Sequence, residues 1–272
     1  MSPLIPQEGW IVQHLFYRID HGFWQALSAE QRSARLKRFA ETLAAVRATP
    51  STQLLCFSMV NAKADLGFML LGPDLQQVNA QQKQLALSLG PDVLEVEWSY
   101  LSMTEWTEYS EKPEEASERI ARTENLEVGS DAHNERMAQW KSHMDKYFQD
   151  RLYPTMPDWP VMCFYPMSKR RWVGANWYAL DFAKRRELMS GHARTGRKYA
   201  GKVRQLVTGS TGLDSHEWGV TLFAHDLFQI KSIVYEMRWD EVTTQFGDFG
   251  DFFIGIQLKD EELPQRLQLL GA

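Results

Sequence analysis

The residue types most suited to chemistry lie in one short segment, YPMSK, at residues 165–169. In an extended strand, residues two and four apart share a face, so the Tyr165 phenol, the Met167 thioether and the Lys169 ammonium project together. Phe164 and Ser168 then point the other way. A phenol beside a fixed cation suits one-electron oxidation or recognition of an anion. A core tyrosine with a solvated basic rim would produce the same pattern.

A histidine on the element that follows is a candidate metal ligand. Asp181 is typical of a helix N-cap, and the predicted helix runs toward His192, with Gly196 as its terminator. On that helix Leu188 and Met189 would flank the imidazole, which suits contact with a porphyrin face. The alternative is a histidine stabilised by the dipole at the helix C-terminus.

Length, charge and cysteine count narrow the class of protein. The 272 residues suffice for one large or two small domains. The net charge of −5 argues against nucleic-acid binding as the main role, despite the cations at Lys169, Arg170, Arg171, Arg197, Lys198 and Lys202. Cys56 and Cys163 lie in apolar stretches, which favours reduced thiols and a cytoplasmic location. We expect no signal peptide and no membrane span.

The chain divides into two halves with the same predicted order of elements. The first half has predicted strands at Gly9–Asp20, Gln53–Val60, Ala64–Leu71 and Val93–Tyr109, with helices after Ser28 and Asp74. The second has predicted strands at Val161–Lys169, Tyr199–Thr208, Trp218–Ala224 and Phe252–Leu258, with helices after Asp181 and Asp226. Two successive βαββαβ units predict an α+β fold of two tandem ferredoxin-like domains, which could form one barrel-like body.

A charged segment separates the two halves. It is rich in Glu, Lys, Arg and Ser, and two short helices are predicted near 114–123 and 133–148. We therefore expect an N-terminal domain at 1–109, a helical connector at 110–150 without chemistry of its own, and a C-terminal domain at 151–272.

Longer motifs indicate a known family. FYPMSKRR, NWYALD, RRELMSGHARTGRKYAGKV, TGSTGLDSHEWGVTLFA, IVYEMRWDEV and FGDFGDFFIG follow one another between residues 151 and 256. Together they resemble the coproheme decarboxylases, the haem-synthesising branch of the chlorite dismutase family, and a weaker resemblance continues through residues 9–109. The resemblance implies tandem ferredoxin-like domains, assembly as a homopentamer, and a coproheme site in the second domain.

The implied activity is that of an oxidoreductase that makes haem b from Fe-coproporphyrin III (coproheme) with hydrogen peroxide. Coproheme would be both substrate and redox cofactor. The resemblance makes Tyr165 a radical relay that takes a hydrogen atom from a propionate, which then loses carbon dioxide and leaves a vinyl group. It makes His192 the axial iron ligand, although relatives have glycine where this chain has Ala193. A coproporphyrin ferrochelatase is the partner protein that it suggests.

Coproheme carries four propionates, so its site needs several cationic or hydrogen-bonding groups. The resemblance assigns this role to Arg151, Tyr165, Pro166, Met167, Ser168, Lys169, Arg238 and Thr243. Relatives usually have serine at the position of Thr243. For any single one of these cations, a surface ion pair is the ordinary role. Glu241 is the candidate acceptor behind His192.

The residue at the distal position separates two branches of the family. It is arginine in chlorite dismutases and glutamine in one decarboxylase branch, and the match GKVRQLV places Gln205 there. Arg204 is its neighbour and would face the other side of the strand, so a shift of one residue would change the predicted activity. Chlorite decomposition to chloride and oxygen, and a haem-binding protein without turnover, are the alternatives.

Overall fold

The computed structural model describes residues 2–270, which form two compact units. The smaller unit, Glu105–Thr155, contains the helices α4 (Pro113–Glu124) and α5 (Asp131–Leu152). Pro113 stands at the start of α4, and the Ser130 side chain caps α5 by accepting a hydrogen bond from the His133 N–H. The helices predicted at 114–123 and 133–148 lie inside these two.

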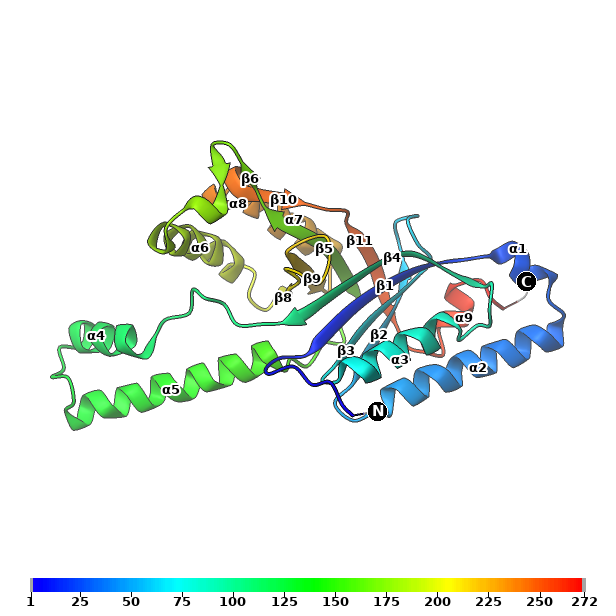
Figure 1. The fold of residues 1–272 in the computed structure, drawn as a ribbon, viewed down its shortest axis with the longest axis horizontal. Coiled ribbons are helices and arrows are strands. Elements are labelled where there is room, and N and C mark those ends of the chain that lie inside the picture. Colours follow the sequence, from blue (N-terminus) through cyan, green and yellow to red (C-terminus); the bar gives the residue numbers. More distant parts are fainter. Residues whose placement is uncertain (1, 271–272) are drawn as a thin grey trace. The chain divides into compact units, whose positions relative to one another are not determined.

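The larger unit, Met1–Thr104 with Met156–Ala272, is built around an antiparallel sheet. Its strands are β1 (Ile11–Ile19), β2 (Gln53–Met59), β3 (Leu66–Gly72), β4 (Leu94–Thr104), β5 (Val161–Lys169), β8 (Val203–Gly209), β9 (Trp218–Ala224), β10 (Gly247–Phe249) and β11 (Phe253–Leu258). Their order is β10-β5-β11-β2-β3-β1-β4-β8-β9, and β9 pairs again with β5. The sheet therefore closes into a ring, and the predicted α+β barrel-like fold is confirmed (Figure 1).

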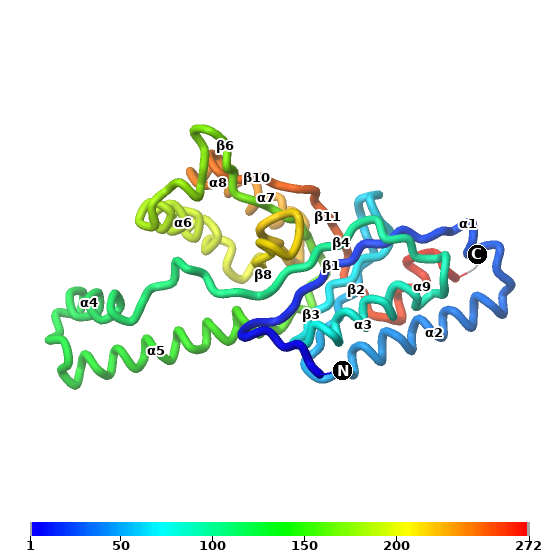
Figure 2. The backbone as a smooth tube through the Cα atoms, in the orientation of Figure 1, coloured from blue at the N-terminus to red at the C-terminus, as the bar shows by residue number. Residues whose placement is uncertain are grey.

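Both halves of the ring use the same strand order. The first half runs β2-β3-β1-β4 and the second runs β11-β5-β9-β8, which is the order expected of a ferredoxin-like βαββαβ unit. Two seams join the halves, one between β11 and β2 and the other between β4 and β8, where only Met103 and Thr104 pair across. In Figure 2 the orange β11 runs beside the green β5, although the two strands are far apart in the sequence.

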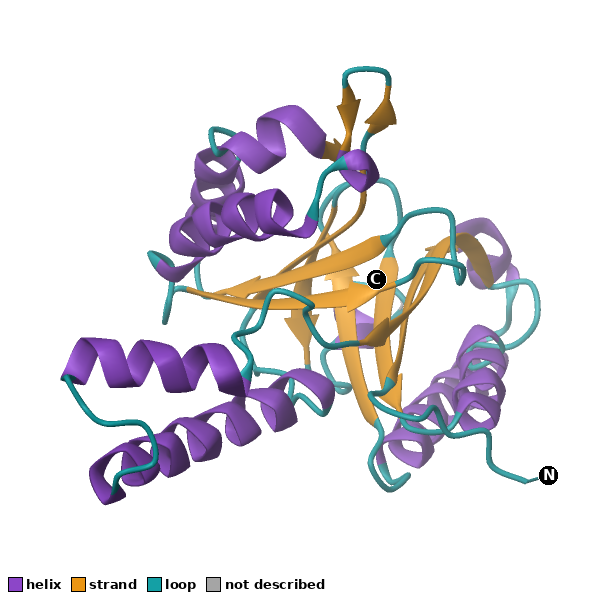
Figure 3. Ribbon diagram, turned by 60° about the vertical axis from the view of Figure 1, so that its left-hand side comes forward, coloured by secondary structure: helices purple, strands orange, loops and turns teal. Residues whose placement is uncertain are grey.

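Helices cover the outer faces of the sheet (Figure 3). The remaining elements are α1 (His21–Ala26), α2 (Ala29–Arg47), α3 (Leu75–Ala86), β6 (Arg171–Trp172), β7 (Ala175–Asn176), the 3-10 helix Trp177–Ala179, α6 (Phe182–Arg197), α7 (Leu227–Met237), α8 (Glu241–Phe246) and α9 (Leu263–Arg266). Ser28 and Gln31 form a capping box at the start of α2, and α3, α6 and α7 begin at the expected caps Asp74, Asp181 and Asp226.

Side chains of β5 alternate between two apolar cores. Phe164 belongs to the core inside the ring, where it packs against Phe16, Trp98 and Tyr100. Tyr165, the next residue, belongs to the core between the sheet and α7. The predicted alternation along this strand is therefore confirmed, and it places the phenol on the helix-covered face.

The end of α6 differs from the prediction. Gly196 does not terminate the helix, which continues to Arg197 with Lys198 as its C-cap. A Cβ at Gly196 would lie 3.3 Å from the Met237 side chain and 3.4 Å from Gln205 Nε2, so packing accounts for this glycine. The chain then forms turns, and β8 begins at Val203 instead of Tyr199.

Candidate functional site

Tyr165 is almost fully buried on the helix-covered face of β5. Its ring stacks on Phe252 with centroids 4.5 Å apart and lies 5.7 Å from the ring of Phe249. Burial raises the pKa of Tyr165 well above its ordinary value, Cys163 raises it further, and Arg238 opposes the increase. The phenol is therefore protonated at neutral pH, and its oxidation must release a proton together with an electron.

Pro166 explains how these aromatic rings reach Tyr165. Proline has no N–H for the strand ladder, and β5 pairs with β11 through residues 161–164 and with β10 through residues 167–169. Residues 250–252 leave the ladder between these strands, and Gly250 N–H donates to the Pro166 carbonyl over 2.8 Å. A Cβ on Gly250 would lie 2.6 Å from Pro166 Cγ, so this close approach requires glycine. The bulge carries Phe252 onto the phenol.

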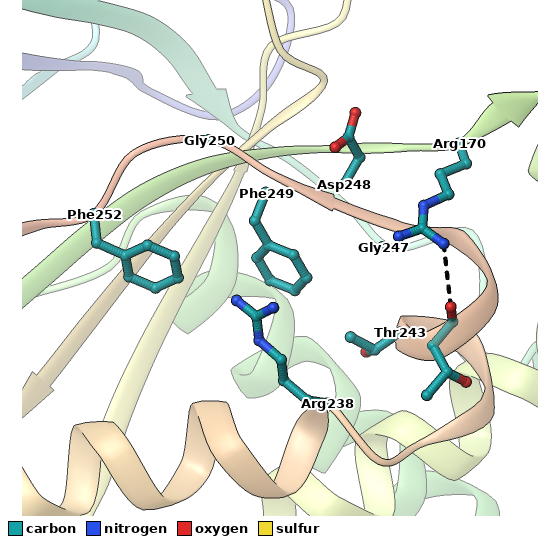
Figure 4. A pocket seen from close by; sticks show the side chains of 9 residues that line it. Arg170, Arg238, Thr243, Gly247, Asp248, Phe249, Gly250 and Phe252 are labelled. Atoms are coloured by element: carbon teal, nitrogen blue, oxygen red, sulfur yellow. Dashed lines mark hydrogen bonds between the residues drawn. The ribbon is translucent and has the colours of Figure 1, made fainter.

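A pocket of about 420 Å³ opens beside this bulge. Its lining residues are Arg170, Arg238, Thr243, Thr244, Gly247, Asp248, Phe249, Gly250 and Phe252. Figure 4 shows the Arg238 guanidinium beneath the Phe249 ring, 4.5 Å from its centroid, and Asp248 pointing to the opposite side of the strand. The pocket thus combines aromatic walls with guanidinium groups, which suits a flat apolar ligand that carries carboxylates.

His192 lies on α6, and a carboxylate from another element holds its imidazole. Its Nδ1 is 2.8 Å from Oδ2 of Asp240, the N-cap residue of α8. The other oxygen of Asp240 accepts from the N–H of Thr243, which lines the pocket. Our assignment of this acceptor role to Glu241 was wrong. A Glu241 carboxylate oxygen lies 3.7 Å from Nζ of Lys184, another residue of α6, and it is Asp240, at the cap position, that reaches the imidazole.

The ionisation of Asp240 determines the tautomer of His192. Burial raises the pKa of Asp240, but hydrogen bonds from His192 and from the Thr243 N–H outweigh it, so the net pKa lies below its ordinary value. An ionised carboxylate only accepts hydrogen bonds, so His192 Nδ1 carries the proton. In the neutral imidazole Nε2 then has the lone pair, and among the described residues Nε2 has no hydrogen-bond partner. This is the arrangement in which a histidine binds iron.

Lys169 is a buried cation at the end of β5. Its Nζ lies 4.7 Å from the centroid of the Trp177 ring, and its backbone N–H donates to a Glu217 carboxylate oxygen over 2.7 Å. Burial lowers the pKa of Lys169 to about 8, against the opposing attraction of Asp240 and Glu217. An anionic ligand placed beside this ammonium would compensate for its lost hydration.

Gln205 and Arg204 occupy opposite faces of β8. Gln205 pairs with Leu222, a member of the core that contains Tyr165, whereas Arg204 pairs with Phe223 of the core inside the ring. Gln205 Nε2 also lies close to Gly196 of α6. The glutamine is therefore the member of this pair on the face that carries Tyr165 and α6.

Three other predicted site residues, Met167, Ser168 and Arg151, have no contact among the described residues that assigns them to the pocket. The Ser168 hydroxyl accepts from the Glu217 N–H over 3.3 Å and points away from Tyr165, while half-buried Met167 packs on the Tyr165 side. Arg151 belongs to the smaller unit, where its Nε donates to the Glu105 carbonyl over 2.8 Å. The roles of Arg151 and Ser168 in ligand binding stay predictions.

Several residues at the site were missed by sequence reasoning. Asp240, Glu217, Phe249 and Phe252 each contact or adjoin a predicted residue, and Arg170 lines the pocket. The signals were present in the aspartate three residues before Thr243, typical of an N-cap, and in the repeated Gly-Asp-Phe of residues 247–252.

Comparison with known proteins identifies the family. Residues 30–258 match the chlorite dismutase family, and the chain belongs to it. A coproheme decarboxylase of Oceanobacillus iheyensis is 36% identical over 269 residues, which are 98% of this chain and 98% of that protein. Together these matches confirm the predicted family resemblance.

Solved structures agree with the family assignment. A haem-binding protein from Thermus thermophilus is 33% identical, with a TM-score of 0.80 over 98% of this chain and 99% of its own. A mutant chlorite dismutase from Candidatus Nitrospira defluvii is 15% identical, with a TM-score of 0.72 over 96% and 97% of the two chains, and shares the fold.

Residues 2–270 contain neither a membrane-spanning helix nor a cluster of metal-binding side chains. No helix there is both long enough and apolar enough to span a bilayer. Within the same residues, no three His, Cys, Asp or Glu side chains are grouped so that they could hold a metal ion.

Proposed function

We propose that this protein is a coproheme decarboxylase, which uses hydrogen peroxide to convert two propionates of Fe-coproporphyrin III into the vinyl groups of haem b. The observation that carries the proposal is one constellation. A buried, protonated phenol adjoins a pocket with guanidinium groups, and Asp240 holds a histidine with its Nε2 lone pair available. The relative named coproheme decarboxylase, which is 36% identical over 98% of this chain, supports it.

The residues present fit an iron porphyrin. His192 Nε2 would ligate the iron, because its ring is oriented and polarised through Nδ1. Phe249 and Phe252 would supply apolar walls, while Arg238, Lys169 and Thr243 would receive carboxylates. Arg238 has no carboxylate partner among the described residues, so its charge is available to a ligand.

The chain's own task in the reaction is to relay a hydrogen atom. The bound iron porphyrin supplies the oxidising power when it meets peroxide. Tyr165 gives up an electron and its Oη proton, and the phenoxyl then takes a hydrogen atom from a propionate β-carbon. Loss of one more electron from the substrate breaks the bond to the carboxylate, which leaves as carbon dioxide. Each decarboxylation thus releases two electrons, which one peroxide accepts, and Tyr165 is restored.

The neutral side chain of Gln205 favours decarboxylation over chlorite decomposition. A chlorite-derived anion would be stabilised by a fixed positive charge at the distal position of β8. Gln205 provides none there, and Arg204 belongs to the opposite face of β8. We therefore expect peroxide to drive turnover and chlorite to bleach the porphyrin.

The proposal extends to the protein's surroundings on the strength of the family resemblance. We infer a cytoplasmic homopentamer that receives coproheme from a coproporphyrin ferrochelatase, the class of enzyme whose product is this substrate. Both cysteines are buried and unpaired, in keeping with a reducing compartment.

Mass spectrometry of the porphyrin during peroxide titration tests the function. The wild type should give a product lighter by two carbon dioxide molecules. Tyr165→Phe preserves the ring contacts but cannot form a phenoxyl radical, so it should bind coproheme with a similar Soret band and yield no product. A wild type that binds coproheme without converting it would contradict the proposed reaction. Conversion by Tyr165→Phe at the wild-type rate would contradict the relay.

A further inference from the structure

Arg170 lines the pocket, but neither the sequence motifs nor the proposed mechanism assigns a role to its guanidinium. It follows Lys169 at the end of β5, and its backbone N–H donates to the Phe246 carbonyl over 2.9 Å. Its Nη1 donates to the Thr244 and Gln245 carbonyls over 3.2 and 3.3 Å. One side of the guanidinium therefore ties the end of α8 to the sheet (Figure 4).

The opposite edge of the same guanidinium has no acceptor. Arg170 Nε is buried and has no hydrogen-bond partner among the described residues, and no carboxylate there pairs with this side chain. A buried N–H without an acceptor is costly, and native structures seldom contain one unless a ligand or water supplies the partner. Nε and Nη2 form the edge through which arginine binds a carboxylate with two parallel hydrogen bonds.

The pocket that Arg170 lines favours an anion. Arg170 shares the pocket lining with Arg238 and the Thr243 hydroxyl. Asp248 is the acidic residue among the lining residues, and its side chain points to the far side of β10 (Figure 4). The Trp172 ring, 5.0 Å from Arg170 Cζ, covers the guanidinium without offering an acceptor.

We propose that Arg170 is a substrate-binding residue, whose Nε edge pairs with one carboxylate of the porphyrin. This inference rests on the proposed function, because it takes the ligand to be a porphyrin with propionate groups. Arg170 acts in two directions. It fixes the end of α8, whose first turn carries Thr243, and it accepts a ligand carboxylate into the space that this positioning creates.

Binding of metal-free coproporphyrin III, followed by fluorescence quenching, tests Arg170 without iron or turnover. Arg170→Gln keeps an amide that can donate to the α8 carbonyls but removes the charge and the bidentate edge. It should weaken binding about tenfold or more, the loss expected for a charged hydrogen bond. The porphyrin tetramethyl ester has no charge to pair, so its affinity should change less than about twofold.

Two further variants separate local pairing from charge and from folding. Arg171→Gln removes an equal charge from the adjacent residue, which is exposed and absent from the pocket lining, and should leave both affinities within about twofold of the wild type. Arg170→Lys keeps the charge without the fork and should lose part of the affinity for the acid, which tests the inference even if Arg170→Gln does not fold.

The possible failures are distinguishable. Equal loss for acid and ester in Arg170→Gln would show that the residue acts only on the fold, and equal losses in Arg170→Gln and Arg171→Gln would show a general field effect. Either result would overturn the inference about Arg170 but not the proposed function. The same holds if Arg170→Gln and Arg170→Lys both bind the acid with wild-type affinity. Failure of the wild type to bind either porphyrin overturns the proposed function and this inference with it.

Discussion

Replacing Lys169 with methionine should make the protein more stable at neutral pH. Lys169 is buried against Trp177, and its attraction to Asp240 and Glu217 does not compensate for its lost hydration. Methionine has a similar length and fills the same space without a charge. The charged lysine therefore lowers the stability of the ligand-free protein, and a bound anion would offset this loss.

The size of this cost follows from the depressed pKa. The ordinary lysine pKa of 10.5 applies to the unfolded chain, and the folded protein lowers it to about 8. Below pH 8 the ammonium is charged in both states, so the full penalty of about 3 kcal/mol is present. Between pH 8 and 10.5 the unfolded state binds the extra proton, so the wild type gains stability relative to Lys169→Met as the pH rises.

Urea unfolding of both proteins at a series of pH values measures the difference. Lys169→Met should be more stable by about 3 kcal/mol at pH 7 and nearly equal to the wild type near pH 10.5. Taking the difference cancels the titration of the other groups. A variant that is less stable at pH 7, or a difference that does not change with pH, would refute the argument that Lys169 is a desolvated cation.

Three other perturbations follow from the structure. Asp240→Asn should weaken iron-porphyrin binding about 10–100-fold and lower the iron–imidazole stretching frequency in resonance Raman spectra. Glu241→Gln should do neither, and equal effects of the two substitutions would contradict Asp240 as the partner of His192. Burial lowers the pKa of His14 to about 3, so the free energy of unfolding should fall as the pH drops below 6.5, by about 3 kcal/mol at pH 4.5. In urea unfolding, His14→Phe should lack this acid dependence. Gly250→Ala should lower the free energy of unfolding by about 1–3 kcal/mol, measured by thermal unfolding, because its Cβ meets Pro166. Gly191→Ala in α6 should be neutral or stabilising. A larger loss of stability in Gly191→Ala than in Gly250→Ala would contradict the close approach at the bulge.

The parts of the fold that the sequence predicted depend on local chemistry. Ser28, Asp74, Asp181 and Asp226 begin helices because their side chains accept hydrogen bonds from N–H groups two or three residues later, a signal contained in the sequence itself. The alternation along β5 is local in the same way. The separation of Tyr165 and Phe164 onto opposite faces therefore needed no knowledge of the rest of the molecule.

The parts that were missed depend on which distant segments meet. Asp240 and His192 are 48 residues apart, and the carboxylate that reaches the imidazole is determined by how α8 packs on α6. The stacking of Phe252 on Tyr165 likewise depends on how the segment between β10 and β11 meets β5 at Pro166. Periodicity within a segment contains no information about such pairings.

The two seams of the ring determine how either half would behave if it were separated from the other. Each four-stranded half has two outer strands, β2 and β4 in the first and β8 and β11 in the second, and each would expose unpaired N–H and C=O groups if it stood alone. Such edges readily recruit another strand, and closure of the ring removes them. A separated half would therefore be prone to pair with a second copy of itself. Covalent linkage within one chain favours closure, because each edge meets its partner at high effective concentration before another molecule arrives.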